Sequence, residues 1–368
     1  MQVQALTERL ISYETDTAEG IRACAGFVKG WLEARDVEVR DGTHNDLPVL
    51  AATVGAEVGP TVVFHGHLDV VPGFPEQYEP RVEGDRLFGR GAYDMKGGLA
   101  AMMCAVRDVA EQSSVRVHFV CVSDEEADTL DARGSDYLVA RGYVGDFAIT
   151  GEPTDLHIGI QSKGVLALRI TVSGKSAHGS TPWLGDNAVL KAIDVFRQIS
   201  AMPFARESSE LFDRPSISLG RVMGGDAFNK VPDCCVIDVD VRYLPGQDPE
   251  RILADVKAIP DTEVEVVVRR EPAVVDRDNP FVATLAEVLA GEHSGPEALS
   301  VGRDGASDIV SFLSAGVPGV EFGPIGAGHH GPEEWVSLAS LERYRDALVH
   351  FVHAIPQRIE STPHLRIA

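Results

Sequence analysis

Two hydrophobic periods alternate along the first 160 or so residues of the chain. Apolar side chains recur at helical spacing in residues 3–13 and 18–32, which predicts two helices packed on a sheet. Short apolar runs of the β type lie between and after them, at residues 37–40, 49–54, 61–65, 115–123 and 146–150. Several of these runs have no polar face, so they predict strands buried between helices in an α/β domain.

The last quarter of the chain continues this pattern. Residues 317–322 predict one more buried strand. Helical spacing predicts helices over residues 280–289, 308–314 and 337–354. Residues 72–85, rich in Pro, Gly and Glu, predict a loop.

The middle of the chain has a different rhythm. Its apolar pattern predicts strand, helix, strand, strand, helix and strand between residues 165 and 269, the βαββαβ order of a ferredoxin-like unit. Residues 235–243 alternate between apolar and charged side chains, as expected of a sheet with one wet face. The predicted architecture is a doubly wound mixed-sheet domain, residues 1–163 and 272–368, with an α+β unit, residues 164–271, inserted into it.

Acidic and imidazole side chains follow strand after strand of the predicted large sheet. They are His67 and Asp69 after the third run, Glu125 and Glu126 after the fourth, Glu152 after the fifth, and His329 and His330 after the last, with Asp94 at a loop-to-helix junction. Ligand sites of open α/β sheets lie beyond the carboxyl ends of the strands. We therefore expect these groups to meet in one crevice.

Two imidazoles and several carboxylates without a nearby thiolate suit zinc, cobalt or manganese. The carboxylates are too many for one ion, and a pair of ions bridged by one carboxylate would use them economically. Of the adjacent Glu125 and Glu126, one can bind a metal while the other accepts a proton from water. That combination indicates hydrolysis of an amide bond.

Each feature also has a plain structural interpretation. A histidine after a strand is often a hydrogen-bonded loop residue, and Glu152 before a proline can be a turn carboxylate. The pair Glu125 and Glu126 can be the acidic start of a helix. Their joint occurrence after successive strands favours the metal site.

Six ordered motifs span nearly the whole chain: HGHLD, GRGAYDMKGG, SDEE, GEP, SAHGSTP and HHGPEEW. With them the sequence resembles the metal-dependent family of acetylornithine deacetylase, succinyl-diaminopimelate desuccinylase, aminoacylase and carboxypeptidase G. The resemblance implies two zinc ions, with cobalt or manganese as substitutes. It implies His67 and Glu152 on one ion, Glu126 and His330 on the other, and Asp94 bridging them. It also implies that Asp69 orients His67 and that Glu125 is the general base, with a cis peptide between Asp94 and Met95.

The same resemblance makes the inserted unit a lid and dimerisation domain. His178 would reach across a homodimer to stabilise the tetrahedral oxyanion, and Asn229 and Arg242 would bind substrate. Arg242 could instead pair with a carboxylate on the polar face of its strand. Residues 306–309 depart from the family's usual pattern, which leaves the role of Asp308 open.

The overall charge narrows the list of partners. With 56 acidic against 33 basic side chains, the chain carries a formal charge of -23, which would repel a nucleic acid. No stretch approaches the length of an apolar membrane span, and five cysteines without a CxxC pair fit a reducing compartment. We expect a cytoplasmic homodimer without a nucleic-acid or membrane partner.

The expected activity is dizinc-dependent removal of an acyl group from an amino acid, of the deacetylase or desuccinylase type. A dipeptidase or carboxypeptidase on the same scaffold is the nearest alternative. A metal-bound binding protein without catalysis is an alternative of another class, and the presence of Glu125 argues against it. An oxygen-dependent iron or manganese enzyme would leave the paired glutamates without a role.

Overall fold

The computed structural model describes residues 2–112, 114–127, 133–291 and 300–361, with side chains up to residue 355. The chain divides into two compact units. The first unit comprises residues 1–160, 275–301 and 308–368, and the second comprises residues 161–274 and 302–307. No described helix is both long and apolar enough to cross a membrane.

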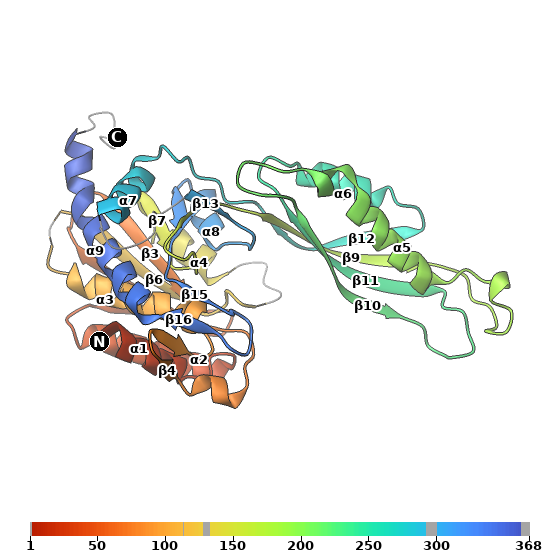
Figure 1. The fold of residues 1–368 in the computed structure, drawn as a ribbon, viewed down its shortest axis with the longest axis horizontal. Helices are drawn as coiled ribbons and strands as arrows, with labels where there is room; N and C mark the ends of the chain where they lie inside the picture. The colour runs from red at the N-terminus through yellow and green to blue at the C-terminus, as the bar shows by residue number, and fades with distance from the viewer. Residues whose placement is uncertain (1, 113, 128–132, 292–299, 362–368) are drawn as a thin grey trace. The chain divides into compact units, whose positions relative to one another are not determined.

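An eight-stranded mixed sheet, ordered β1-β2-β6-β3-β7-β14-β8-β13, forms the centre of the first unit (Figure 1). Its central strands β6, β3, β7 and β14 run parallel, and β1, β2 and β8 run antiparallel to their neighbours. The strands are β1 (Val39–His44), β2 (Leu47–Gly55), β3 (Thr61–His67), β6 (Arg116–Val122), β7 (Phe147–Thr150), β8 (Ile158–Ser162), β13 (Ser300–Arg303) and β14 (Gly319–Glu321). The strand prediction is confirmed for the parallel centre, where buried runs are continuous.

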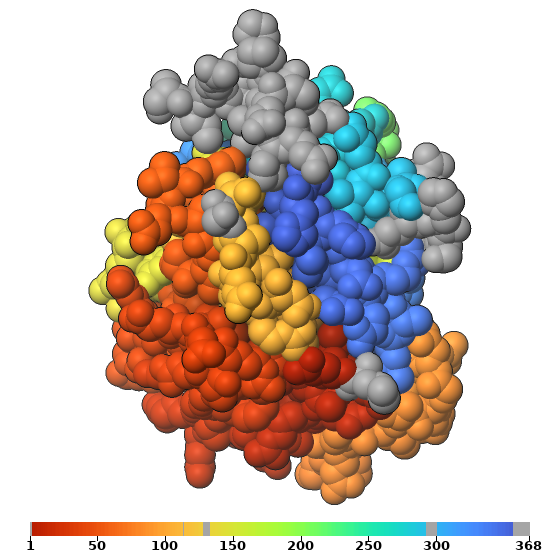
Figure 2. Space-filling model, turned by 90° about the vertical axis from the view of Figure 1, so that its left-hand side faces the viewer, coloured from red at the N-terminus to blue at the C-terminus, as the bar shows by residue number. Residues whose placement is uncertain are grey.

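Helices cover both faces of this sheet. The helices are α1 (Gln2–Ile11), α2 (Ala18–Glu33), α3 (Gly97–Asp108), α4 (Gly134–Ala140), α7 (Pro280–Gly291), α8 (Ile309–Ser314) and α9 (Leu338–Ser361). Adjacent residues of β3 show the two layers, because Gly66 faces Leu99 of α3 while His65 contacts Ser135 of α4 and Phe312 of α8. Figure 2 shows α3, α9 and α7 side by side on the outer surface of one layer. α2 packs on β1 and β2, whereas α1 packs on α3 rather than on the sheet.

The predicted loop at residues 72–85 is partly ordered into short elements. It contains the 3-10 turn η1 (Pro75–Tyr78) and the strand β4 (Arg81–Glu83). β4 joins a small sheet, ordered β15-β16-β5-β4, with β5 (Arg86–Phe88), β15 (Gly326–Ala327) and β16 (Trp335–Ser337). These strands are two or three residues long, too short to show a hydrophobic period.

The second unit confirms the predicted ferredoxin-like order. Its elements are β9 (Gly164–Ser173), α5 (Ala188–Ala201), β10 (Ser216–Gly224), β11 (Cys234–Tyr243), α6 (Pro249–Lys257) and β12 (Thr262–Arg270), with turns η3 (Pro182–Leu184) and η4 (Pro203–Arg206). The antiparallel sheet is ordered β10-β11-β9-β12, and both helices pack on one face (Figure 1). Along β11 buried and partly exposed side chains alternate, so the other face carries the charged residues.

Candidate metal centre

The ends of β3 and β7 bring the first predicted ligands together in the first unit. His67 is the last residue of β3 and is fully buried. Its Nε2 lies 3.3 Å from Asp94 Oδ1 and 3.7 Å from Glu152 Oε1. Asp94 comes from the irregular turn η2 (Ala92–Lys96), where the Asp94–Met95 peptide is cis as the resemblance implied. Glu152 follows β7, so two parallel strands and one turn meet here.

The other oxygen of Asp94 faces a second imidazole. His330 Nε2 lies 3.4 Å from Asp94 Oδ2 and 3.0 Å from Glu126 Oε1. One carboxylate therefore stands between two histidines with one oxygen toward each, which is the placement that a bridging ligand needs. His329 instead packs against Tyr93, with ring centroids 6.0 Å apart.

Donor atoms of His67, Asp94 and Glu126 all lie within 4.8 Å of one another.

The ring of His67 is held from its far side by Asp69. His67 Nδ1 lies 2.9 Å from the main-chain oxygen of Asp69 and 3.6 Å from its carboxylate Oδ1. Since Nδ1 is occupied in this way, Nε2 is left to face the cluster. Asp69 Oδ2 also accepts the backbone N–H of Glu126 at 2.8 Å, which ties both sides of the site to one residue.

The pKa values of the cluster are shifted because several carboxylates lie close together. Burial alone would lower the pKa of His67, but its hydrogen bond with Asp94 and the charges of Glu152 and Asp69 hold that pKa well above its usual range. Hydrogen bonds to Asp94 and Glu126 raise the pKa of His330 to about 10. Burial and the charge of Asp94 raise the pKa of Glu152. These directions share one cause, the negative charge gathered around His67 and His330, and a bound cation would offset the same charge.

Two buried oxygens in the site have no hydrogen-bond donor among the described residues, Asp69 Oδ1 and Glu152 Oε1. A proton on His67 Nε2 can serve Asp94 but not Glu152 as well, because Glu152 Oε1 is 3.7 Å away. A divalent cation can accept several oxygens and nitrogens at once, and this nitrogen and oxygen donor set suits zinc, cobalt or manganese. The residues present fit such an ion.

The neighbouring Glu125 has a different partner from Glu126. Its Oε1 accepts a hydrogen bond from Arg133 Nη1 at 2.8 Å, and its side chain is 17% exposed. Burial and the negative charge of Asp308 raise the pKa of Glu125 to about 7, although the Arg133 cation opposes this. A carboxylate that titrates near neutral pH is suited to accepting and returning a proton.

Glu334 holds the backbone that carries Asp94, a role that sequence reasoning missed. Its Oε1 accepts the N–H groups of Tyr93 and Asp94 at 3.0 and 3.1 Å. Its Oε2 accepts the N–H of Gly91 at 3.0 Å and a hydrogen bond from Arg90 Nη1 at 2.9 Å. Both charged side chains are almost completely buried. The second glutamate of HHGPEEW was the available signal, although a sequence does not show that the side chain turns inward.

Sequence reasoning also missed Arg133, Ser135 and His65, and it left Asp308 open. Arg133 Nη1 donates to Asp308 Oδ1 at 2.9 Å as well as to Glu125. Ser135 Oγ donates to Asp308 Oδ2 at 2.5 Å and lies 2.8 Å from His65 Nε2. The need to balance a run of acids was the one signal for a nearby cation.

The predicted substrate residues lie in the second unit. His178 and Asn229 come from adjoining segments, because the N–H of Gly179 donates to the main-chain oxygen of Asn229 at 2.7 Å. Both side chains are exposed, and His178 Nδ1 lies 2.7 Å from Ser180 Oγ. Arg242 Nε donates to Asp240 at 2.9 Å on the polar face of β11.

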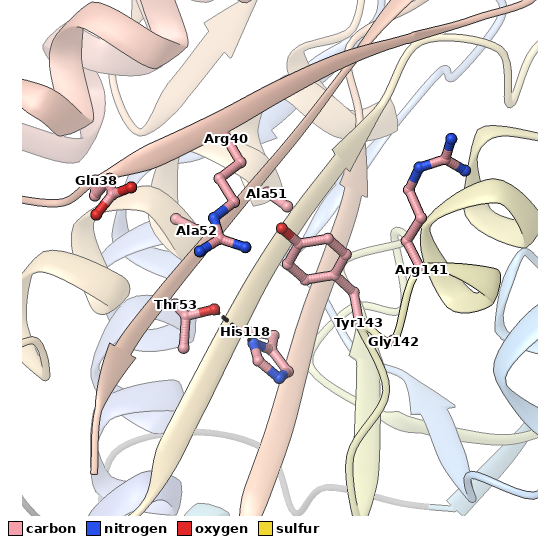
Figure 3. A pocket seen from close by; sticks show the side chains of 9 residues that line it. All are labelled: Glu38, Arg40, Ala51, Ala52, Thr53, His118, Arg141, Gly142 and Tyr143. Atoms are coloured by element: carbon pink, nitrogen blue, oxygen red, sulfur yellow. Dashed lines mark hydrogen bonds between the residues drawn. The ribbon is translucent and has the colours of Figure 1, made fainter. Parts of the chain in front are cut away.

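A hollow of about 340 Å³ lies elsewhere in the first unit, over β1, β2 and β6. Figure 3 shows Arg40, His118 and Tyr143 converging over these strands. Burial and the nearby Arg116 lower the pKa of His118 to about 4. Two arginines, Arg40 and Arg141, line this hollow with a single carboxylate, Glu38, and a single imidazole, which is a poor donor set for a divalent ion. Of these two places in the first unit, the carboxylate and imidazole cluster has the donor set that suits a divalent ion.

An α/β sheet whose parallel central strands lead into a cluster of carboxylates and imidazoles provides the donors of a hydrolytic metal site. A model of the peptidase family M20/M25/M40 matches residues 63–354. The chain belongs to this family and is a hydrolytic enzyme, and membership implies a divalent metal.

Relatives with curated names extend over most of the chain. A succinyl-diaminopimelate desuccinylase of Gluconacetobacter diazotrophicus is 32% identical over 330 residues, 84% of each chain. One of Gluconobacter oxydans is 31% identical over 302 residues, 77% of this chain and 78% of that one. Among solved structures, a tripeptidase from Staphylococcus aureus has a TM-score of 0.80 at 21% identity, covering 97% of this chain and 98% of the other. A metallo-carboxypeptidase from Sulfolobus solfataricus has a TM-score of 0.78 at 18% identity, covering 97% and 100%. These two structural similarities bear on the fold.

Proposed function

We propose that this enzyme hydrolyses the amide bond of an N-acyl amino acid with two zinc ions bound in the cluster. The observation that carries the proposal is the position of Asp94, which directs one carboxylate oxygen toward His67 and the other toward His330. A second glutamate beside the cluster, Glu125, is held apart from it by Arg133. This gives one group to share two cations and another to move a proton.

The donor groups divide into two sets. His67 and Glu152 would hold one ion, Glu126 and His330 the other, and Asp94 would bridge them. When bound, such ions act as Lewis acids, which lower the pKa of a bound water and polarise the scissile carbonyl. Cobalt or manganese can occupy the same nitrogen and oxygen donors.

Glu125 supplies the proton transfers. Its carboxylate takes a proton from the attacking water as the water oxygen bonds to the carbonyl carbon. It then gives that proton to the amine nitrogen as the carbon–nitrogen bond breaks, so the products are a carboxylic acid and an amine. Asp69 keeps the ring of His67 in place throughout, through the contacts at Nδ1.

The second unit would complete the site as a lid and as the interface of a homodimer. His178 would donate a hydrogen bond to the oxyanion of the tetrahedral intermediate. Asn229 would contact the substrate, and Arg242 would bind its carboxylate after exchanging its present partner Asp240.

The names of the relatives suggest the first substrates to test. Two relatives more than 30% identical are succinyl-diaminopimelate desuccinylases, so N-succinyl amino acids come first and N-acetyl amino acids second. Dipeptides and peptides with a free carboxyl end test the dipeptidase and carboxypeptidase alternatives.

The first experiment compares the chelated protein with protein reloaded with zinc, cobalt or manganese. We expect hydrolysis of an N-acyl amino acid that is lost on chelation and restored by about two ions per chain. Turnover of dipeptides alone would transfer the assignment to the alternative activity. A stoichiometry of one ion would contradict the bridged pair.

The second experiment replaces the proposed base. Glu125→Gln should lower kcat by about 10² to 10⁴ while two ions still bind, because the proton acceptor is removed and the ligands stay. The exposed Glu111 provides the matched control, and Glu111→Gln should leave kcat unchanged. A parent protein as inactive as Glu125→Gln on every substrate would favour the binding-protein alternative.

A further inference from the structure

A line of hydrogen-bonded groups runs from the central sheet through the start of α4 to the residue before α8, and from there to Glu125. It starts at Thr150 at the end of β7, whose hydroxyl contacts His65 Nδ1. His65 Nε2 lies 2.8 Å from Ser135 Oγ at the start of α4, and Ser135 Oγ lies 2.5 Å from Asp308 Oδ2. Arg133 Nη1 then spans Asp308 Oδ1 at 2.9 Å and Glu125 Oε1 at 2.8 Å.

The direction of each hydrogen bond follows from the chemistry of its members. A carboxylate can only accept, so the hydroxyl of Ser135 must donate its one proton to Asp308. Ser135 must then accept from His65, which puts the ring proton on Nε2 and leaves Nδ1 to accept from Thr150. Phe312 packs edge-on against the same ring, with centroids 5.6 Å apart. Every member therefore has one orientation.

Asp308 occupies a position where an aspartate usually does something else. It precedes α8 as the N-cap residue, and an aspartate there normally accepts a hydrogen bond from the first turn of its helix. Here the side chain makes no such bond and turns to Arg133 and Ser135 instead. It is also fully buried, a placement that is costly for a charge without a cation beside it.

We propose that Arg133 and Asp308 are positioning residues that fix the orientation of the Glu125 carboxylate. Asp308 holds Arg133 from the protein interior, and the same Nη1 atom then fixes Glu125 Oε1, leaving the other oxygen of Glu125 to receive the proton. This inference rests on the proposed function, since it concerns the general base of that reaction. It assigns a task to Asp308, which the motif pattern left open.

The test measures kcat and KM separately in three variants and compares each with the parent. Asp308→Asn removes the charge that holds Arg133. Arg133→Lys keeps the positive charge, but the side chain is shorter and its compact ammonium group lacks the planar guanidinium that contacts both carboxylates. Each should lower kcat by about 10- to 100-fold with KM within about threefold, because a small misplacement of a catalytic group has effects of that size. Ser135→Ala, a milder change, should lower kcat by a smaller factor in the same direction.

Two further measurements separate positioning from general damage. Zinc titration by calorimetry should match that of the parent, since none of the three residues is a predicted ligand. Breaking a buried ion pair lowers stability, so the thermal midpoint serves to show that each variant is folded at the assay temperature. In the Glu125→Gln background Asp308→Asn should lower the residual kcat no further, because its effect passes through Glu125. The matched controls are Asp304→Asn, an exposed carboxylate on the preceding loop, and Arg141→Met at the exposed end of α4, both with parental kcat.

The possible outcomes are distinct. Parental kcat in Arg133→Lys and Asp308→Asn overturns the inference, and so does an equal further loss in the Glu125→Gln background. Should Asp308→Asn fail to fold, Ser135→Ala and Arg133→Lys decide the matter by the same criteria. A parent that hydrolyses no amide would overturn the proposed function itself, which is a different result from an active parent whose variants keep their kcat.

Discussion

A single buried carboxylate, Glu334, fixes the backbone that leads into Asp94. It accepts four hydrogen bonds, three of them from the backbone N–H groups of Gly91, Tyr93 and Asp94 at the start of the turn η2. In Glu334→Gln an N–H₂ group would face those donors, so at least one buried N–H would lose its acceptor. We expect the free energy of unfolding to fall by about 1–3 kcal/mol and zinc affinity to fall with it. Chemical unfolding and calorimetric zinc titration measure both.

The adjacent residue provides the control for this prediction. Glu333 is 74% exposed and pairs with the exposed Arg81 at 3.3 Å, a contact that contributes little. Glu333→Gln should therefore match the parent in both measurements. If Glu334→Gln and Glu333→Gln behaved alike, the hydrogen bonds of Glu334 to the turn η2 would contribute neither to stability nor to zinc affinity.

A second residue-scale prediction concerns pH and lies away from the cluster. Burial and Arg116 lower the pKa of His118 to about 4, whereas in the unfolded chain it titrates near 6.5. Between these values the unfolded chain binds a proton that the folded chain does not, so this contribution to stability is lost as pH falls from about 6.5 to 4.

The measurement is the difference in unfolding free energy between the parent and His118→Gln. This difference should shrink by about 1–2 kcal/mol from pH 6.5 to pH 4, discounted because the ring is only half-buried. The exposed His353 gives the control, and the difference for His353→Gln should stay constant. A difference for His118 that grows on acidification would reverse the sign of the argument.

Some of the site could be predicted because its chemistry is out of place in an ordinary fold. Histidines and acids at the tips of buried strands have no packing role, so His67 and Glu152 stood out, and the structure places them together. Arg133 and Asp308 could not be found in this way. Arg133 follows no strand, and its ion-pair partner Asp308 is 175 residues away in the sequence. Such pairings come from tertiary contact, which leaves no local pattern.

At the level of elements, the start of α3 lies directly against the end of β7. A Cβ added to Gly98 would come within 2.6 Å of the main-chain oxygen of Gly151. Because Asp94 precedes α3 and Glu152 follows Gly151, a shift of the helix would separate two predicted ligands. Gly98→Ala should lower the free energy of unfolding by about 1–3 kcal/mol and weaken zinc binding.

A glycine in another helix provides the matched comparison. Gly26 lies on the exposed side of α2, where an added Cβ would meet nothing within 4 Å. Gly26→Ala should raise the free energy of unfolding by about 0.5–1 kcal/mol, because alanine favours the helix more than glycine does, and leave zinc binding unchanged. Unfolding in denaturant with a parallel zinc titration decides the point. A stable Gly98→Ala with parental zinc affinity would contradict the close contact.

Predictability of the elements followed their length and burial. α2 is sixteen residues long, with Thr17 capping its first turn, and the parallel strand β3 is buried along nearly its whole length, so both produced clear periods. The turn η2 and the strands β4 and β15 owe their conformations to contacts from elsewhere, such as the bonds of Glu334 around Asp94. A local pattern cannot indicate those contacts, and the loop prediction for residues 72–85 was incomplete for this reason.

At the scale of the whole molecule, the second unit has an exposed edge suited to a second copy. β10 is an edge strand whose residues are mostly exposed, and Val222 and Met223 on it are 41% and 43% exposed. On the adjoining α5, Leu190 is 64% exposed. An unpaired strand edge next to apolar side chains favours pairing between chains. Since each side chain would occur twice in a twofold interface, Leu190→Glu combined with Met223→Glu should convert a dimer to a monomer in light scattering.

An exposed apolar residue of the first unit controls for surface charge alone. Val58 is 88% exposed, and Val58→Glu should leave the oligomeric state unchanged. If the parent is itself a monomer at all concentrations tested, the homodimer proposal is wrong.

Mixing two inactive chains tests whether His178 acts on its partner. Chains with His178→Ala keep Glu125, and chains with Glu125→Gln keep His178, so a mixed dimer would regain one complete site only if His178 reaches across. With random exchange half of the dimers are mixed and each has one working site of two, so about a quarter of the parental kcat should return. If His178 served its own chain, every site would still lack one group and the mixture would stay as inactive as its components. That second result would also remove the reason for linking dimerisation to catalysis, because each chain would then be complete in itself.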